Sequence, residues 1–168
     1  MRWLVILGLL AGAASADVPV YVAVQWHMHQ PIYRPGEDIV ATSHNPGNTL
    51  DVVGFLTWPD RMGAYTHYPI DSIAQFLDLP HAGAQISFSG SLIEDLDALA
   101  AAGTGYGKDW PARYREGRGW KTALGNPRVD LVGFGYDHPL MAFLEPDEIR
   151  DQVRAHGEAL RAKFGGPH

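Results

Sequence analysis

The chain has 168 residues, 46% of them hydrophobic and 19% charged, which is an ordinary balance for a globular protein and excludes a disordered chain. A net charge of -6, without any long Lys/Arg cluster, argues against nucleic acid as a partner. The chain contains no cysteine, so it can form neither a disulfide nor a zinc-thiolate site.

The first 16 residues have the pattern of a secretory signal peptide. Arg2 precedes a short apolar run, and Ala14-Ser15-Ala16 provides the small residues that a signal peptidase recognises. The run is too short to span a bilayer. We therefore predict a signal peptide over residues 1–16, cleavage after Ala16, and an exported protein over residues 17–168. That protein would be periplasmic or extracellular, with no membrane segment after cleavage.

Residues 18–24 carry valine at every second position, with Pro19, Tyr21 and Ala23 between them. Such a run, apolar on both faces, indicates a buried strand of a parallel sheet. It leads into Trp26-His27-Met28-His29-Gln30, after which Pro31 cannot continue a ladder. The end of a parallel strand at which the chain leaves it faces the ligand in α/β sheets and barrels, so His27 and His29 are candidate site residues.

Side chains alternate along a strand, so His27 and His29 lie on the same side. This spacing suits polar contacts to a substrate, and it also suits metal ligation. Histidines near a strand end can also serve the structure alone through hydrogen bonds. The spacing alone does not decide between substrate contacts, metal ligation and a structural role.

Residues 27–33, HMHQPIY, resemble the opening motif of glycoside hydrolase family 57. That family comprises retaining enzymes that act on α-glucans, among them α-amylases, 4-α-glucanotransferases and branching enzymes. The resemblance implies a (β/α) barrel and an α-glucan or oligosaccharide substrate, and it implies substrate contacts for His27 and His29.

The middle of the chain alternates between helical and strand patterns. Residues 34–62 have Pro and Gly punctuation and predict a long loop on the active face. A helix is predicted over residues 64–79, followed by a strand over 84–88 and a second helix from Ser89 or Ser91 to about 102. A loop is predicted over residues 103–127, with a short helix around 112–116. FSGSLIEDL, residues 88–96, resembles the second strand and helix of family 57; Glu94 is interpreted as a capping or surface acid without a catalytic role.

Residues 128–134 predict the third strand, and a helix is predicted from Glu145 to about Phe164, with Pro146 in its first turn. The segment VDLVG followed by His-Pro-Leu resembles the third-strand region of family 57, which implies substrate contacts for Asp130 and His138. The family usually has Glu at the position of Asp130. An acid in an apolar strand can instead have a purely structural partner.

These elements predict the α/β class: an incomplete (β/α) barrel of the glycoside hydrolase family 57 type, with about three βα units and parallel strands. In that family the nucleophile lies on the strand after the helix that ends near residue 165, and the acid/base lies farther on. We therefore expect an N-terminal barrel portion without a catalytic residue of its own, inactive alone, needing no cofactor or metal. It could self-associate through an open sheet edge.

Two other functions remain open. A metal-dependent hydrolase could use His27 and His29, with His138 as a third ligand. A non-catalytic glycan-binding protein would use the same residues without turnover.

Overall fold

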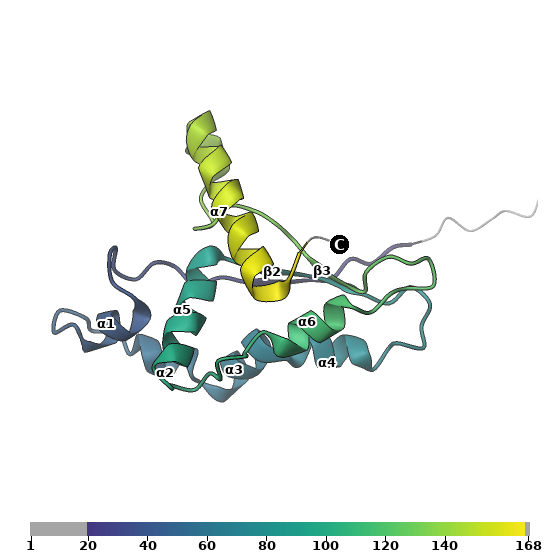
Figure 1. Ribbon diagram of the computed structural model, residues 1–168, viewed down its shortest axis with the longest axis horizontal. Coiled ribbons are helices and arrows are strands. Elements are labelled where there is room, and N and C mark those ends of the chain that lie inside the picture. The colour runs from purple at the N-terminus through teal and green to yellow at the C-terminus, as the bar shows by residue number, and fades with distance from the viewer. Residues whose placement is uncertain (1–19, 167–168) are drawn as a thin grey trace, which may run out of the picture.

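The computed structural model describes residues 20–166, so the predicted signal peptide and its cleavage after Ala16 lie outside the described residues. Three strands form one parallel sheet: β1 (Gln25–Met28), β2 (Ala84–Phe88) and β3 (Val129–Leu131). They lie side by side in chain order. Helical segments connect them along the chain (Figure 1). The predicted α/β class with parallel strands is confirmed. Three strands are too few to close a barrel, so the arrangement is an incomplete one.

The central strand, β2, anchors the hydrophobic core. Its Phe88 is fully buried, as expected for the middle of a parallel sheet. The Phe88 ring lies 5.0 Å from that of Tyr114 in α6 (Ala112–Arg118) and 5.1 Å from that of Phe164 in α7 (Pro146–Phe164), measured between centroids. Such aromatic contacts stabilise beyond simple burial. They fix both helices to the middle of the sheet.

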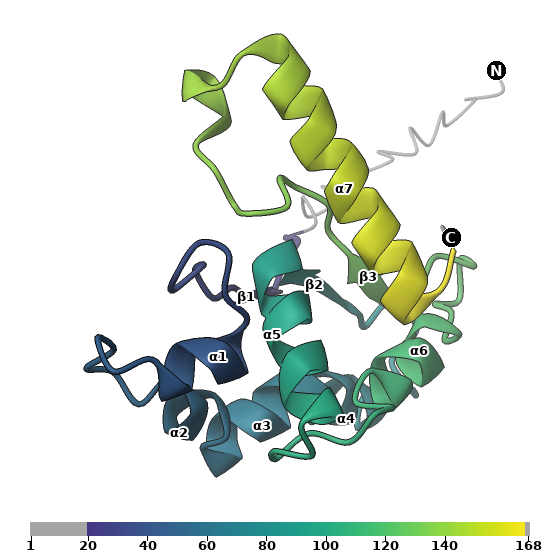
Figure 2. The same cartoon turned by 60° about the vertical axis from the view of Figure 1, so that its left-hand side comes forward.

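The helix after β2, α5 (Gly90–Ala101), forms where the sequence predicts it. The hydroxyl of Ser89 accepts the backbone N–H of Leu92 at 3.2 Å, which satisfies a donor that the first turn would otherwise leave free. Fully buried leucines recur along one face at helical spacing: Leu92, Leu96 and Leu99. This helix lies beside α7 (Figure 2).

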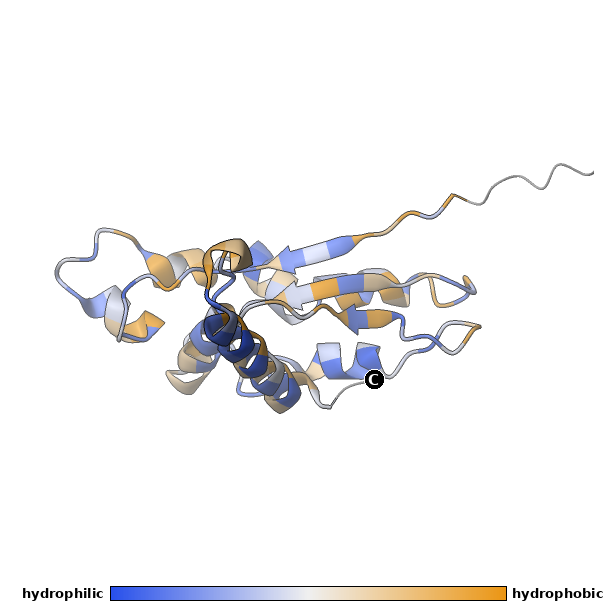
Figure 3. Cartoon of the chain, turned by 90° about the horizontal axis from the view of Figure 1, so that it is seen from above, coloured by the Kyte–Doolittle hydropathy of each residue, from blue (hydrophilic) through white to orange (hydrophobic). Residues whose placement is uncertain are grey.

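Residues 20–24, which lead into β1, are exposed, contrary to the prediction of a buried strand over residues 18–24; residues 18 and 19 lie outside the described residues. Val20 is 88% exposed and Val22 is 84% exposed, and pairing with β2 begins at Gln25. Figure 3 shows this apolar segment extending away from the sheet. β1 is an edge strand, so one of its sides has no neighbouring strand among residues 20–166. An alternating apolar pattern does not reveal whether a strand is central or peripheral.

Residues 34–62 are not the loop that the sequence predicts. They contain α1 (Ile39–His44), α2 (Val52–Leu56) and the first part of α3 (Pro59–Thr66). The prediction was wrong because helices this short do not display a repeating apolar stripe. Aspartates at the N-caps of α1 and α2 accept backbone N–H groups of the first turn, so local capping defines where these helices begin.

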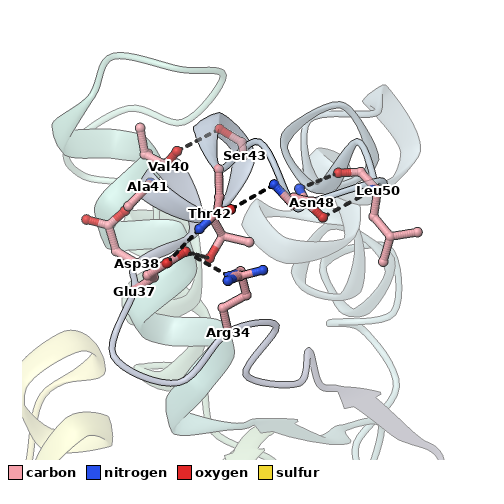
Figure 4. A network of polar contacts seen from close by, with 11 residues as sticks. Arg34, Glu37, Asp38, Val40, Ala41, Thr42, Ser43, Asn48 and Leu50 are labelled. Atoms are coloured by element: carbon pink, nitrogen blue, oxygen red, sulfur yellow. Dashed lines mark hydrogen bonds and ion pairs between the residues drawn. The ribbon is translucent and has the colours of Figure 1, made fainter.

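A network of polar contacts orders the start of this region (Figure 4). Glu37 accepts a hydrogen bond from the Nδ2 of Asn45 at 2.8 Å and forms an ion pair with Arg34 at 3.2 Å. Asp38 accepts the backbone N–H of Ala41 at 2.7 Å. The chain after β1 is therefore held against α1.

The helix predicted over residues 64–79 is divided between α3 and α4 (Tyr68–Ala74). His67 separates them, with a φ of -155° that no helix can accommodate. The ring of Tyr68 folds back onto α3, where a Cβ on Gly63 would lie 2.1 Å from it. Only glycine leaves room for this close contact.

The last part of the chain follows the prediction closely. The short helix expected around residues 112–116 is α6, and the third strand is β3, shorter than predicted. A single turn of 3-10 helix, η1 (Met141–Phe143), precedes α7, which begins with a capping box between Glu145 and Glu148. Within residues 20–166, no helix combines the length and the apolar character needed to cross a membrane.

Candidate functional site

Three imidazole rings meet where β1 ends and where the chain has left β3. The ring centroids are 4.7 Å apart for His27 and His138, 4.9 Å for His29 and His138, and 6.3 Å for His27 and His29. We call these three residues the histidine cluster. It lies at the end of the parallel strands where α/β sheets bind their ligands.

The parallel sheet explains why two of these rings share one side. Side chains alternate along β1, which puts His27 and His29 on the same face. His27 is paired in register with Ser87 of β2, and its Nδ1 lies 2.8 Å from the Ser87 hydroxyl oxygen. Ser87 is fully buried, so this hydrogen bond fixes an exposed ring to the central strand.

The third ring reaches the cluster through an unusual backbone conformation. His138 has a φ of 57°, in the left-handed region that residues other than glycine rarely adopt. Its backbone N–H donates to the carbonyl of Gly135 at 3.0 Å, which closes a tight turn. Backbone strain of this kind persists where the surrounding structure holds it, and it is frequent at functional sites.

The ring of Phe134 forms the floor of the cluster. Its centroid lies 4.9 Å from that of His138 and 5.9 Å from that of His27. The cluster thus combines polar ring nitrogens with an apolar aromatic surface, and ligand-binding sites use both kinds of group.

The imidazoles of His27 and His29 favour the neutral form. Desolvation by the neighbouring groups, followed by repulsion from His138, lowers the pKa of His27. The same two causes in the same order lower the pKa of His29, and His27 adds to the repulsion. A neutral imidazole has one N–H donor and one acceptor nitrogen. The Nδ1 of His27 is engaged by Ser87 and the Nδ1 of His29 is a buried atom, so the Nε2 of each ring is left to donate to or accept from a hydroxylated ligand, according to the position of the ring proton.

Asp130, the fourth predicted site residue, does not join the histidine cluster. It pairs in register with Gln85, which in turn pairs with Gln25 of β1. His27 and His29 are two and four residues beyond Gln25, so about 7 Å and about 13 Å along the strands separate their levels from that of Asp130 at about 3.3 Å per residue, and β2 lies between Asp130 and β1. Asp130 instead lies near Arg118 and lines a pocket with it; burial lowers the pKa of Arg118, and the Asp130 carboxylate opposes this shift.

No group of three or more His, Cys, Asp or Glu side chains within residues 20–166 is arranged to hold a metal ion. The close approach of the three rings therefore gives no geometric support to the metal-dependent alternative.

The sequence analysis did not identify Ser87 and Phe134 as site residues, although the sequence around each of them carries a weak indication. Ser87 is a polar residue inside an otherwise apolar strand, and Phe134 immediately precedes the Gly-Tyr-Asp-His turn. Glu94, interpreted as a capping or surface acid, is exposed and accepts a hydrogen bond from the hydroxyl of Tyr136 at 2.5 Å. The capping role at that helix belongs to Ser89.

A separate cavity of about 440 Å³ lies between α1 and α5. Asp95 and Tyr33 line it, together with Glu94. The Oδ2 atom of Asp95 is buried without a hydrogen-bond partner among the described residues. Burial, then repulsion from Glu94 and Asp38, raises the pKa of Asp95 to about 7.

No family model matches the chain. An α-amylase from Niallia circulans is 26% identical over 123 residues, which is 68% of this chain and 9% of the α-amylase. The chain thus spans about a tenth of that relative. Among solved structures, the 4-α-glucanotransferase from Thermococcus litoralis is 17% identical with a TM-score of 0.49, covering 86% of this chain and 17% of that one.

Proposed function

We propose that this chain binds α-glucans through the histidine cluster, as part of a glycoside hydrolase or glucanotransferase of the family 57 type. The observation that carries the proposal is the convergence of His27, His29 and His138 at the ligand-binding end of the strands. Neutral imidazoles offer the donors and acceptors that sugar hydroxyls require. The similarity to an α-amylase and the HMHQPIY motif support the same class of substrate.

The role proposed for residues 20–166 is binding and not bond cleavage. A retaining glycosidase needs two carboxyl groups about 5 Å apart, one as the nucleophile and one as the acid/base. In family 57 the nucleophile follows the helix that corresponds to α7, and we assign neither role to a described residue. Asp130 lies about 13 Å along the strands from the level of His29, so it would contact a different sugar unit.

We also propose that the protein is exported, with cleavage after Ala16. The support is the sequence of residues 1–16 alone, in which an apolar run ends in Ala14-Ser15-Ala16. An exported protein would meet polymeric glucans outside the cytoplasm.

Isothermal titration of the purified protein with maltoheptaose tests the binding proposal. The variant His29→Ala should weaken binding, because one hydrogen bond contributes about 1 kcal/mol, or roughly a fivefold change in Kd. His81→Ala is the matched control, since His81 is exposed and outside the histidine cluster. Wild-type protein that binds no maltoheptaose would refute the proposal, as would equal weakening by both variants.

A reducing-sugar assay on starch separates binding from turnover. We expect no release of reducing sugar by the 168-residue protein. Turnover that disappears in Asp130→Ala would show that this chain supplies a catalytic acid, and the assignment of a binding role alone would then be wrong.

A further inference from the structure

The turn that carries His138 is held in place by one face of α7. Gln152 and His156 lie one helical turn apart and therefore on the same side of this helix. The Oε1 of Gln152 accepts the backbone N–H of Asp137 at 2.9 Å, and the Gln152 carbonyl accepts that of Tyr136 at 3.2 Å. The Nδ1 of His156 accepts the backbone N–H of Phe134 at 3.2 Å. Figure 2 shows the chain leaving β3 and passing beside α7 before it turns into that helix.

The hydrogen bonds of His156 specify one form of its ring. The Phe134 N–H can only donate, so Nδ1 must be the acceptor. The carbonyl oxygen of Phe88, 2.7 Å from Nε2, can only accept, so Nε2 carries the proton. His156 is 1% exposed, and this burial lowers its pKa, against a smaller opposite effect of the bond to Phe88. The ring is therefore neutral with its proton on Nε2.

His156 connects the central strand to the histidine cluster through one aromatic ring. Its Nε2 is hydrogen-bonded to the carbonyl of Phe88 at the end of β2. Its Nδ1 is hydrogen-bonded to the backbone N–H of Phe134, whose ring contacts the histidine cluster. The Phe134 ring lies 4.6 Å from the His156 ring and 4.9 Å from the His138 ring, between centroids. A change in the Phe134 backbone would therefore move the rings of the cluster.

We infer that His156 is a positioning residue that sets the arrangement of the histidine cluster through its Nδ1 bond to the Phe134 N–H. Its relevance to glucan recognition rests on the proposed function, but the positioning itself does not. The bond to Phe88 serves to orient the His156 ring. The two bonds thus have different consequences, which substitution can separate.

Asparagine and glutamine each reproduce one of the two ring nitrogens. The amide oxygen of Asn at position 156 can take the place of Nδ1 and accept the Phe134 N–H. The amide nitrogen of Gln can take the place of Nε2 and donate to the Phe88 carbonyl. We therefore compare His156→Asn with His156→Gln, and use Arg150→Gln, an exposed change on the same helix, as the control.

The readout is the set of imidazole Hε1 chemical shifts of His27 and His138, recorded by NMR without any glucan. We expect His156→Asn and the Arg150→Gln control to keep the wild-type shifts, and His156→Gln to displace both. Urea unfolding of the same samples measures stability independently. Two His156 variants that lose stability but leave both shifts unchanged would show a merely structural role and overturn the inference. Displaced shifts in His156→Asn but not in His156→Gln would also overturn it.

A measurement on the wild-type protein covers the case in which a variant does not fold. Long-range ¹H–¹⁵N correlation reports the ring form of His156 directly, and we expect a protonated Nε2 and an unprotonated Nδ1. The opposite form, or a charged ring at neutral pH, would overturn the inference. Both experiments omit glucan, so a failure of the protein to bind maltoheptaose refutes the proposed function and leaves this result standing.

Discussion

Replacing Asp95 by Asn should remove a pH dependence of stability that the wild-type protein shows. Asp95 lines the cavity between α1 and α5, and its Oδ2 is buried without a hydrogen-bond partner among the described residues. Burial, followed by repulsion from Glu94 and Asp38, raises the pKa of this carboxyl from 3.8 to about 7. The folded protein therefore keeps a proton that the unfolded chain releases at lower pH.

The sign of the effect follows from this raised pKa. The stabilising contribution of the protonated Asp95 is fully present below about pH 4 and is lost as the pH rises through about 7. At about 1.36 kcal/mol per pKa unit, a shift from 3.8 to about 7 corresponds to at most about 4 kcal/mol. The side chain is only partly buried, so we expect a loss of about 2 kcal/mol between pH 4 and pH 8.

Urea unfolding at a series of pH values between 4 and 8 measures this loss. The free energy of unfolding of Asp95→Asn should approach that of the wild type at pH 4 and exceed it at pH 8. Asp78→Asn is the matched control, since Asp78 is exposed. Parallel curves for the wild type and Asp95→Asn over this range would show that the Asp95 carboxyl titrates alike in the folded and unfolded states, and the raised pKa would then be wrong.

Three further predictions concern the core, the sheet edge and the N-terminus. Phe88→Ala should lower the free energy of unfolding by about 3 to 5 kcal/mol, because it empties a fully buried site; urea unfolding at fixed pH measures this, and a loss near that of a surface variant would contradict the packing described. The exposed segment before β1 should promote association, so Val22→Lys should reduce the concentration dependence of the sedimentation coefficient, and an unchanged dependence would show that this edge is not involved. The intact mass of secreted material should equal that of a chain whose first residue is Asp17. Recovery of the chain with Met1 from the culture fluid would exclude cleavage.

Local signals allowed α5 and α7 to be predicted. Ser89 and the Glu145-Pro146 pair mark where these helices begin, and the buried leucines of α5 repeat at helical spacing. α1 and α2 were missed because helices of about one turn depend on their caps and not on periodicity. The exposure of residues 20–24 was missed for a different reason, since it depends on which strands lie alongside β1.

In the candidate site too, local features could be predicted from the sequence, and features that depend on the pairing of distant segments could not. The spacing of His27 and His29 places them on one side of a strand, and that inference needs no tertiary structure. The separation of Asp130 from His29 follows from the register between strands, which the sequence does not state. His156 could not be predicted as a neighbour of the site, because its partner Phe88 lies 68 positions earlier in the chain.

Titration of histidine-labelled protein with maltoheptaose, with every imidazole resonance followed by NMR, shows directly whether the histidine cluster binds α-glucans. If the histidine cluster binds α-glucans, the resonances of His27, His29 and His138 move together and yield one Kd, while that of the exposed His81 stays in place. Cellohexaose, a β-linked glucan, should cause no comparable change. Cluster resonances that do not respond to maltoheptaose, or that move no more than the His81 resonance, would show that the cluster does not bind α-glucans.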